Sequence, residues 1–556
     1  MSGPRLTPSF GHPKPLPCPW KSAAACCPVA CKPAGMGNKP PVAHVLIYMT
    51  RYNLADMKRF LLTLLPAATW AQEKPNVIWL MADDLGYGDI SCYGATRVQT
   101  PNIDRVASQG VRFTDMHACA STSTPSRYGI LTGEYPFCHP DTDVAAGNAG
   151  TIIWPQQYTM ADMMRSAGYR TGAFGKWHLG LGSRTGEQDW NGKLDVGLDS
   201  LGFDYSYIMA ATSDRVPCVF IEQGRIANYD PSAPVQVSYR KNFEGEPTGR
   251  THPELLTKLR PSHGHDMSIV NGISRIGYMK GGGRALWRDE DIADSITAHA
   301  VRFMNECSAS GNPFFMYLCT NDIHVPRMPH ERFRGQSPMG LRGEAILSLD
   351  ETVGAITAEL DRLGIAGNTI LVITSDNGPV LDDGYDDQAE QLAGSHAPGG
   401  AWRGGKYSAF EAGSVVPFIL RWPGHARACE SHAMLSQVDA IGTLADIVGA
   451  RVPDGAAPHS QSMVKSWLGK SRASRSYAVK MAANHALVLR TKDWKYIEPS
   501  KGGPMIPWGP KIETGYKPTP QLFRITQDQG EQTNVADRHP KLVRKFQEQI
   551  DALRQK

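Results

Sequence analysis

The feature that most constrains the fold of this chain is a repeated alternation of short apolar runs with segments of helical period. Apolar residues fill the runs at 76–81 (NVIWLM), 169–174 (YRTGAF, in part), 313–318 (PFFMYL) and 369–374 (TILVIT), as expected of strands buried on both faces. Segments of helical period lie at 159–166, 289–307 and 342–363. This alternation predicts an α/β fold, with a large, mostly parallel sheet flanked by helices.

The length of 556 residues is too great for a single small core, since domains average about 100–200 residues. The alternation continues to residue 424, and we predict one large domain over 72–424 that carries the chemistry. Within it, the irregular stretch 179–283 is expected to form loops over a site. Short strands near 486–496 and a helix over 541–553 predict a smaller α+β subdomain over 425–556, with a small antiparallel sheet and a terminal helix.

The N-terminal region carries the pattern of a signal peptide. Met57-Lys58-Arg59 is followed by the apolar run 60–65 and by small residues up to Ala71, which predicts a signal peptide over 57–71 and export to the periplasm or beyond. Residues 1–56 are rich in Pro, Gly, Ala and Cys without periodicity, and we interpret them as an upstream extension foreign to the native protein. A metal site is the alternative, but its cysteines lack a later His/Cys pair at zinc-finger spacing.

Charge and hydropathy exclude several classes of partner. The formal net charge is +4 and no dense basic stripe occurs, so we predict no nucleic-acid partner. No apolar run reaches the roughly 18–20 residues of a membrane span, and we predict none. Seven cysteines follow residue 71, an odd number that does not indicate a disulfide scaffold.

Oxygen ligands follow two of the predicted strands. Asp83 and Asp84 end the first strand, and Asp376 and Asn377 follow the strand at 369–374. Ligands gather at the carboxyl ends of parallel strands, and adjacent carboxylates repel each other unless a cation neutralises them. The four residues together predict a site for Ca²⁺ or Mg²⁺; either pair alone is also common turn chemistry.

The most specific segment is Ser123-Thr-Pro-Ser-Arg127-Tyr-Gly-Ile-Leu-Thr-Gly133. Its proline favours the first turn of a helix, where free N–H groups attract an anion, and Arg127 adds a permanent charge. Lys176 and His178 lie two residues apart after another strand, and Lys406 follows a glycine pair. Each of these residues alone is most often a capping or solvated residue, but their order along one sheet indicates an anion-binding site.

These motifs together resemble the sulfatases of the alkaline-phosphatase-like superfamily. The family signature is Cys or Ser, any residue, Pro, Ser, Arg, two residues, then Leu-Leu-Thr-Gly, and residues 123–133 match it with Ile130 for the first Leu. The resemblance runs from about Asn76 to the Leu522…Ala536 stretch. It implies an alkaline-phosphatase-like fold, makes 72–424 the catalytic domain, and implies hydrolysis of sulfate monoesters.

The resemblance also implies roles for particular residues. Ser123 takes the position that a radical-SAM maturing enzyme oxidises to formylglycine. The metal ligands, usually of Ca²⁺, are then Asp83, Asp84, Asp376 and Asn377. Arg127, Lys176 and Lys406 match the cations around the sulfate, His178 matches the histidine beside the formylglycine, and His324 matches the histidine near the leaving oxygen.

The substrate is expected to be a sulfated glycan or a small sulfate ester. Segments 237–255 and 262–280 resemble inserts of bacterial carbohydrate sulfatases, which points to a sulfated galactose or N-acetylgalactosamine unit. The candidate sugar contacts are Asp214, Arg215, His265, Asp266, His396 and Arg403. For each of them a structural or surface role is an equal alternative. His263, His265 and Asp266 could also bind a metal ion, but polar packing within the loop is the favoured interpretation of these three residues.

Two rival functions stay open at this point. A phosphomonoesterase or phosphodiesterase of the same superfamily would use unmodified Ser123, but such sites hold two metals and need more His and Asp ligands. The second rival is a sugar-binding relative without catalytic activity. It is disfavoured because every charged position expected of the family's active site is occupied by a charged residue.

Overall fold

The computed structural model describes residues 74–555, which lie within one compact unit, Gln72–Lys556. The predicted extension at 1–56 and the predicted signal peptide at 57–71 lie outside the described residues. Among residues 74–555, no helix combines the length and the apolar character needed to cross a bilayer.

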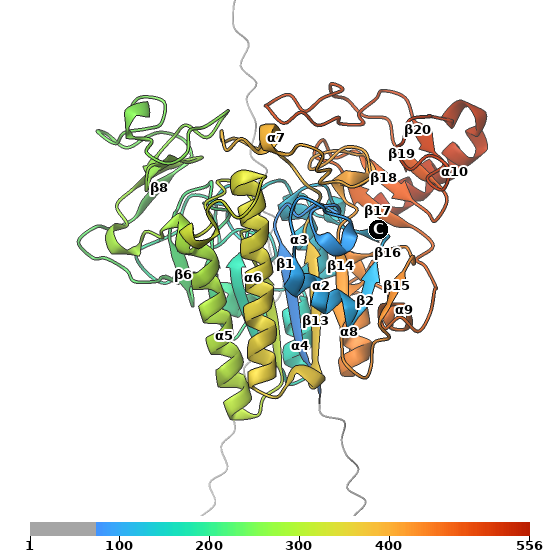
Figure 1. Ribbon diagram of the computed structural model, residues 1–556, viewed down its shortest axis with the longest axis horizontal. Coiled ribbons are helices and arrows are strands. Elements are labelled where there is room, and N and C mark those ends of the chain that lie inside the picture. Colours follow the sequence, from blue (N-terminus) through green and yellow to red (C-terminus); the bar gives the residue numbers. More distant parts are fainter. Residues whose placement is uncertain (1–73, 556) are drawn as a thin grey trace, which may run out of the picture. The chain divides into compact units, whose positions relative to one another are not determined.

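A ten-stranded sheet forms the centre of the fold, in the order β15-β2-β14-β13-β1-β12-β4-β5-β6-β7 (Figure 1). The five parallel strands at its centre are β13 (Thr369–Ser375), β1 (Asn76–Ala82), β12 (Phe314–Cys319), β4 (Arg170–Lys176) and β5 (Tyr205–Met209). Strand β1 is buried from end to end because apolar side chains occupy both of its faces. The predicted large, mostly parallel sheet is confirmed.

Short strands complete both edges of this sheet. On one side these are β14 (Phe418–Arg421), β2 (Val111–Phe113) and β15 (Cys429–Ser431), with β14 antiparallel to β13 and to β2. On the other side they are β6 (Phe220–Glu222) and β7 (Arg225–Ile226), both antiparallel to their neighbours. The stretch 179–283, expected to be loops, therefore also supplies β5, β6 and β7 to the sheet.

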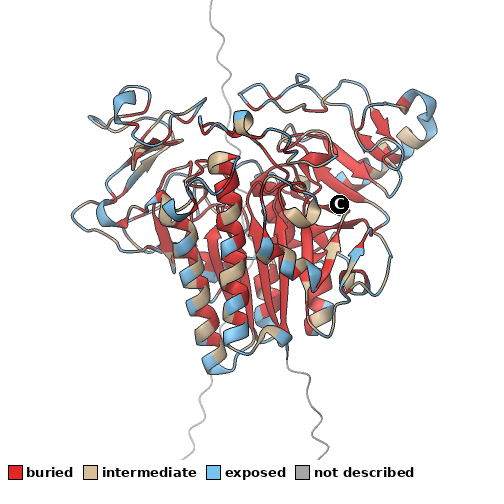
Figure 2. Cartoon of the chain, in the orientation of Figure 1, coloured by how far each residue is buried: buried red, intermediate tan, exposed pale blue. Residues whose placement is uncertain are grey.

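Helices cover both faces of the sheet (Figure 1). One group packs together on one face and consists of α2 (Pro101–Ser108), α5 (Ile292–Ser310) and α6 (Gly340–Arg362). The opposite group consists of α3 (Ser123–Thr132), α4 (Met160–Ser166), α8 (Ala440–Val448) and α9 (Val464–Trp467). Helices α5 and α6 are buried on the side that faces the sheet and exposed on the outer side (Figure 2), as expected of amphipathic helices, whereas α3 is buried along its whole length.

Local sequence explains where these helices begin. Thr159 and Asp162 form a reciprocal capping box at the start of α4. Pro101 is the first residue of α2, where its fixed φ suits the helix and its missing N–H is not needed.

The loops contain small two-stranded sheets and one short helix. The strand pairs are β3 (Met116–His117) with β16 (Leu435–Ser436), β8 (Gln236–Ser238) with β11 (Tyr278–Lys280), and β9 (Ile269–Val270) with β10 (Ile273–Ser274); the short helix is α7 (Ala389–Leu392).

A second, antiparallel sheet lies in the C-terminal part and consists of β17 (Ala478–Met481), β18 (Leu487–Arg490), β19 (Lys495–Ile497) and β20 (Gln521–Phe523). The terminal helix α10 (Pro540–Arg554) packs on it through Phe546, Ile550 and Leu553. However, Leu444 of α8 and Trp467 of α9 share the core of the main sheet. We therefore place the start of the smaller sheet region at Ala478 rather than at residue 425.

Candidate active site

The carboxyl ends of β1 and β13 bring the predicted oxygen ligands together. The two strands pair in parallel up to Ala82 and Ser375, so the residues that follow them lie side by side. The amide Nδ2 of Asn377 donates to Asp84 Oδ1 at 2.7 Å, and the backbone N–H of Asp84 lies 3.4 Å from Asp376 Oδ1. Asp83, Asp84, Asp376 and Asn377 are all fully buried.

Ser123, the first residue of α3, extends its hydroxyl into this group of oxygens. Ser123 Oγ lies 2.7 Å from Asp376 Oδ2 and 3.3 Å from both Asp83 Oδ1 and Asn377 Oδ1. Ligand atoms of Asp83, Asp84 and His324 also lie within 4.8 Å of one another. Oxygens from several residues that converge on one point fit a hard divalent cation, so the donor set suits Ca²⁺ or Mg²⁺.

Three buried cations surround the acidic residues. Lys176 Nζ lies 2.6 Å from both Ser123 Oγ and Asp83 Oδ2. Arg127 Nη2 lies 2.8 Å from Asp376 Oδ2, and its Nε donates to the same oxygen at 2.9 Å. Lys406 Nζ donates to Asp84 Oδ2 at 2.8 Å and to Asp383 Oδ2 at 2.9 Å. Positive groups fixed at this spacing would neutralise an anionic ester.

Burial and these pairs shift the protonation of the cluster in opposite directions. Burial raises the pKa of Asp83 above its ordinary value, although Lys176 and His324 act to lower it; the neighbouring carboxylates of Asp376 and Asp84 act in the same direction as burial. Burial also acts to raise the pKa of Asp376, but Arg127 and Lys176 hold it well below its ordinary value. A cation at this point would favour the charged form of Asp83 as well.

The two predicted histidines are oriented by backbone carbonyls. His178 Nε2 donates to the Ala145 carbonyl at 2.9 Å, which leaves Nδ1 with a free lone pair and no hydrogen-bond partner within the described residues. Burial, together with the nearby charge of Lys176, holds the pKa of His178 well below its ordinary value, so the ring is neutral. His324 Nδ1 lies 2.7 Å from the Val325 carbonyl, and its Nε2 lies 3.9 Å from Asp84 Oδ2.

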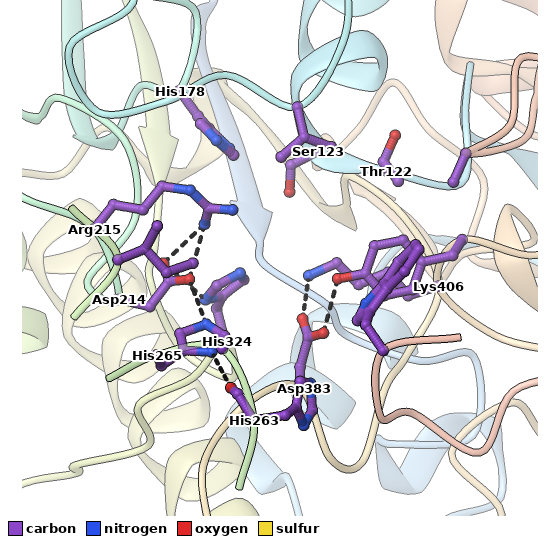
Figure 3. A pocket seen from close by; sticks show the side chains of 16 residues that line it. Thr122, Ser123, His178, Asp214, Arg215, His263, His265, His324, Asp383 and Lys406 are labelled. Atoms are coloured by element: carbon purple, nitrogen blue, oxygen red, sulfur yellow. Dashed lines mark hydrogen bonds and ion pairs between the residues drawn. The ribbon is translucent and has the colours of Figure 1, made fainter. Parts of the chain in front are cut away.

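A cavity of about 400 Å³ opens above these groups (Figure 3). Its lining includes Ser123, His178, His324 and Lys406. The structure thus brings the predicted nucleophile, both histidines and one of the predicted cations to one enclosed space, with the oxygen ligands beneath it.

Three of the six candidate sugar contacts also line this cavity, namely Asp214, Arg215 and His265. Asp214 accepts from Arg215 Nη1 at 2.8 Å and from His265 Nε2 at 3.1 Å. Although burial acts to raise the pKa of Asp214, Arg215 and the neighbouring histidines hold it well below its ordinary value.

The other three candidates do not line the cavity, and each pairs with another residue outside it. Asp266 pairs with Arg250 at 2.8 Å. His396 Nε2 lies 2.7 Å from Asp89 Oδ1. Arg403 pairs with Glu513 at 2.6 Å. We therefore leave Asp266, His396 and Arg403 out of the proposed site.

The cavity also contains residues that sequence reasoning missed. Asp383 accepts hydrogen bonds from Lys406 and from Tyr407 Oη, the latter at 2.7 Å. Tyr407 and Trp508 line the same wall. The doublet Asp382-Asp383 before Gly384 was a detectable signal, but it has the composition of an ordinary turn.

Comparison with known proteins agrees with this geometry. The family model named Sulfatase matches residues 75–450. The chain belongs to the sulfatase family and is a sulfuric ester hydrolase, as the motif at 123–133 indicated.

Two relatives show how far the likeness extends. The chain is 50% identical over 482 residues to an N-acetylgalactosamine-6-O-sulfatase of Bacteroides thetaiotaomicron, covering 87% of this chain and 93% of that protein. It is 29% identical over 400 residues to human arylsulfatase A, covering 71% of this chain and 68% of that protein.

Solved structures show the same fold. A Bacteroides thetaiotaomicron structure described under the metabolism of glycosaminoglycans matches with a TM-score of 0.85 and 49% identity, over 87% of this chain and all of that one. A phosphonate monoester hydrolase of Agrobacterium radiobacter matches with a TM-score of 0.54 and 17% identity, over 86% of this chain and 95% of that one, which shows the fold alone.

Proposed function

We propose that this enzyme removes a 6-O-sulfate from an N-acetylgalactosamine or galactose unit of a glycan, with a formylglycine made from Ser123. The observation that carries the proposal is the position of Ser123 Oγ, within 3.3 Å of oxygens of Asp83, Asp376 and Asn377 and 2.6 Å from Lys176 Nζ. The choice of sugar and sulfate position is supported by 50% identity to the N-acetylgalactosamine-6-O-sulfatase.

Asp83, Asp84, Asp376 and Asn377 would hold the metal ion. Bound Ca²⁺, or Mg²⁺ in its place, would supply positive charge to the oxygens of the sulfate and orient the nucleophilic oxygen. The hydrated aldehyde of formylglycine would supply one hydroxyl for attack on sulfur and a second whose deprotonation lets sulfate leave.

The chain's own charged residues neutralise the ester. Arg127, Lys176 and Lys406 place positive charge around the sulfate, and this charge is most effective in a site from which water is excluded. Lys176, at 2.6 Å from Ser123 Oγ, also favours the deprotonated form of an oxygen at that position.

The two histidines would move protons on opposite sides of the reaction. His178 is neutral and has a free Nδ1 lone pair, so it accepts the proton of the spare hydroxyl. His324 lines the cavity and donates a proton to the leaving oxygen of the sugar. Asp214, Arg215 and His265 would bind hydroxyl groups of the sugar.

Maturation and export complete the proposal. Ser123 is 3% exposed in the folded protein, so the radical-SAM maturing enzyme would have to act before folding closes the site. Residues 57–71 would direct the chain out of the cytoplasm, and residues 72 onward would form the mature enzyme.

The test combines mass spectrometry with turnover. Protein coexpressed with a radical-SAM maturing enzyme is expected to carry an aldehyde at residue 123 and to desulfate 6-O-sulfated N-acetylgalactosamine faster than its 3-O- and 4-O-sulfated isomers. Ser123→Ala is expected to lower kcat at least about 10³-fold while the protein stays folded, because alanine can be neither oxidised nor act as a nucleophile.

Three results would contradict the proposal. Full activity of protein shown to lack the aldehyde would exclude the formylglycine mechanism. Faster turnover of the phosphate ester of the same sugar would favour the phosphatase alternative, and sugar binding by matured protein without any turnover would favour the non-catalytic relative.

A further inference from the structure

The cavity changes character from its base to its rim. At the base, Ser123, His178 and Asp214 are at most 3% exposed. At the rim, two apolar side chains lie open to solvent, since Val144 is 43% and Trp508 46% exposed. A large apolar side chain left exposed at the mouth of a polar cavity indicates a contact surface for a ligand.

Trp508 is held in place by an ordered loop. The N–H of Ile506 donates to the Ile512 carbonyl at 2.9 Å, and the N–H of Thr514 donates to the Pro504 carbonyl at 2.9 Å, so the loop closes like a hairpin below its tip. At the tip, a Cβ on Gly509 would lie 2.2 Å from the ring of His263, which shows that the loop packs against the segment around residue 263.

Tyr407 supports the indole ring from one side. The two rings meet edge to face, with 5.1 Å between their centroids and an angle of 83° between their planes. Tyr407 is itself fixed by the hydrogen bond of its Oη to Asp383. Trp508 therefore stands in a fixed position with much of its surface still open.

A polar group accompanies this aromatic surface. His263 lines the cavity, and its Nε2 is buried without a hydrogen-bond partner in the described part of the chain. An aromatic face at the mouth of a cavity that is also lined by Asp214, Arg215 and Asp383 matches a pyranose, which presents C–H groups on its face and hydroxyl groups at its edge.

We propose that Trp508, Tyr407, Val144 and His263 form a subsite for the sugar ring next to the sulfated one. This inference rests on the proposed function, in which the sulfate and the sulfated ring fill the buried base of the cavity. The next ring of the glycan then lies at the rim, against the exposed indole.

Trp508→Ala is the decisive variant, and Trp154→Ala is its matched control. Trp154 is 52% exposed but does not line the cavity, so both substitutions remove an exposed indole. The substrates are 6-O-sulfated N-acetylgalactosamine alone and two disaccharides that carry a second sugar on either side of it. Trp508→Ala is expected to lower kcat/KM about tenfold on at least one disaccharide, with a change below about twofold on the monosaccharide.

Trp508→Phe should recover most of the loss because it restores an aromatic face, and Trp154→Ala should match the wild type on every substrate. An equal loss on monosaccharide and disaccharides would overturn the proposal, since Trp508 would then contact the sulfated ring itself. Unchanged kcat/KM on both disaccharides would overturn it as well.

Binding separates this proposal from the proposed function. In calorimetric titrations of the Ser123→Ala protein, adding Trp508→Ala is expected to raise the Kd of the disaccharide about tenfold and to leave that of the monosaccharide unchanged. If this binding pattern holds but no matured protein desulfates any of the sugars, the proposed function fails and the subsite stands. If Trp508→Ala does not raise the Kd of the disaccharide, the subsite proposal is wrong whatever the turnover measurements show.

Discussion

Two of the clusters of buried charge among residues 74–555 differ in whether they border a cavity. The cavity cluster, beneath the cavity, consists of Asp83, Asp84, Asp376, Asn377, Arg127, Lys176 and Lys406. The closed cluster combines three cations of the C-terminal sheet with two carboxylates that lie in other segments, and consists of Lys480, Arg490, Lys495, Glu411 and Glu531.

In the closed cluster every charged side chain pairs with at least one of opposite charge. Glu411 is fully buried and pairs with Lys480, with Lys495 at 3.1 Å and with Arg490 at 3.2 Å. Lys480 and Lys495 hold Oε1 and Arg490 holds Oε2, so the closeness of Glu411 to Asp115 and His117 does not make a metal site. None of these residues lines the cavity.

In the cavity cluster, oxygens of Asp83, Asp376 and Asn377 converge on the hydroxyl of Ser123. The cluster borders the cavity, which Ser123 and Lys406 line. Burial of charge therefore does not distinguish a functional site from a structural one. Oxygen ligands that converge on one point, together with an adjoining cavity, do.

The largest expected effect is that of removing the metal. We expect matured enzyme to hold about one equivalent of Ca²⁺ or Mg²⁺, and we expect chelation to lower kcat at least about 10³-fold, because the sulfate then loses its largest neutralising charge. Activity should return when either cation is added back. Elemental analysis and turnover assays provide the measurement.

Paired variants locate the ion. Asp84→Ala should lose the bound metal. His117→Ala should keep it, because His117 lies with Asp115 and Glu411 and not at the cavity. Metal retained by Asp84→Ala and lost from His117→Ala would reverse the comparison.

The second prediction concerns the closed cluster. Glu411→Gln is expected to lower the free energy of unfolding by about 3–5 kcal/mol, because it leaves buried cations without their counter-charge. The kcat of the folded fraction should stay within about twofold of the wild type, because the cluster does not reach the cavity. Urea unfolding and active-site titration measure the two quantities.

Glu430→Gln is the control for this substitution. Glu430 pairs with Arg112 at the surface, and its side chain is 41% exposed, so the change should cost at most about 1 kcal/mol. A kcat loss in Glu411→Gln that exceeds its loss of folded protein would show that the closed cluster also serves the reaction.

The sequence was most informative where burial is complete. The apolar run at 76–81 predicted β1 (Asn76–Ala82) to within one residue, because a strand covered on both faces needs apolar side chains throughout. Strand β5 (Tyr205–Met209) was missed because its sequence, YSYIM, mixes polar and apolar residues, and the edge strands β6 and β7 are too short to show a pattern.

The same reasoning applies to the site. Asp83 and Asp376 follow buried strands, so their place at one edge of the sheet could be inferred from order alone. Trp508 could not be placed, because it lies in a Gly/Pro-rich loop about a hundred residues from Tyr407, and no pattern reports a contact of that kind. Asp266, His396 and Arg403 were named as candidate sugar contacts, but they do not line the cavity, and sequence alone could not show this.

The smallest expected effect concerns Asp383, which belongs to the cavity wall but stabilises the fold as Glu411 does. Burial acts to raise the pKa of Asp383, but Lys406, His324 and the hydrogen bond from Tyr407 lower it from 3.8 to about 2. Above pH 3.8 the carboxylate is charged in both the folded and the unfolded chain, and its stabilisation is complete. As the pH falls from 3.8 to 2 the unfolded chain is protonated first, and the stabilisation is lost.

The wild type and Asp383→Asn should therefore differ in their free energy of unfolding by about 2 kcal/mol more at pH 5 than at pH 2, since the variant lacks this titrating group. Urea unfolding at pH values between these limits measures the difference. Asp382→Asn is the matched control, because it removes the adjacent carboxylate, which accepts from Ser262 at the surface. A difference between wild type and Asp383→Asn that stays constant with pH would show that Lys406 and Tyr407 do not hold the charge of Asp383 in the folded state.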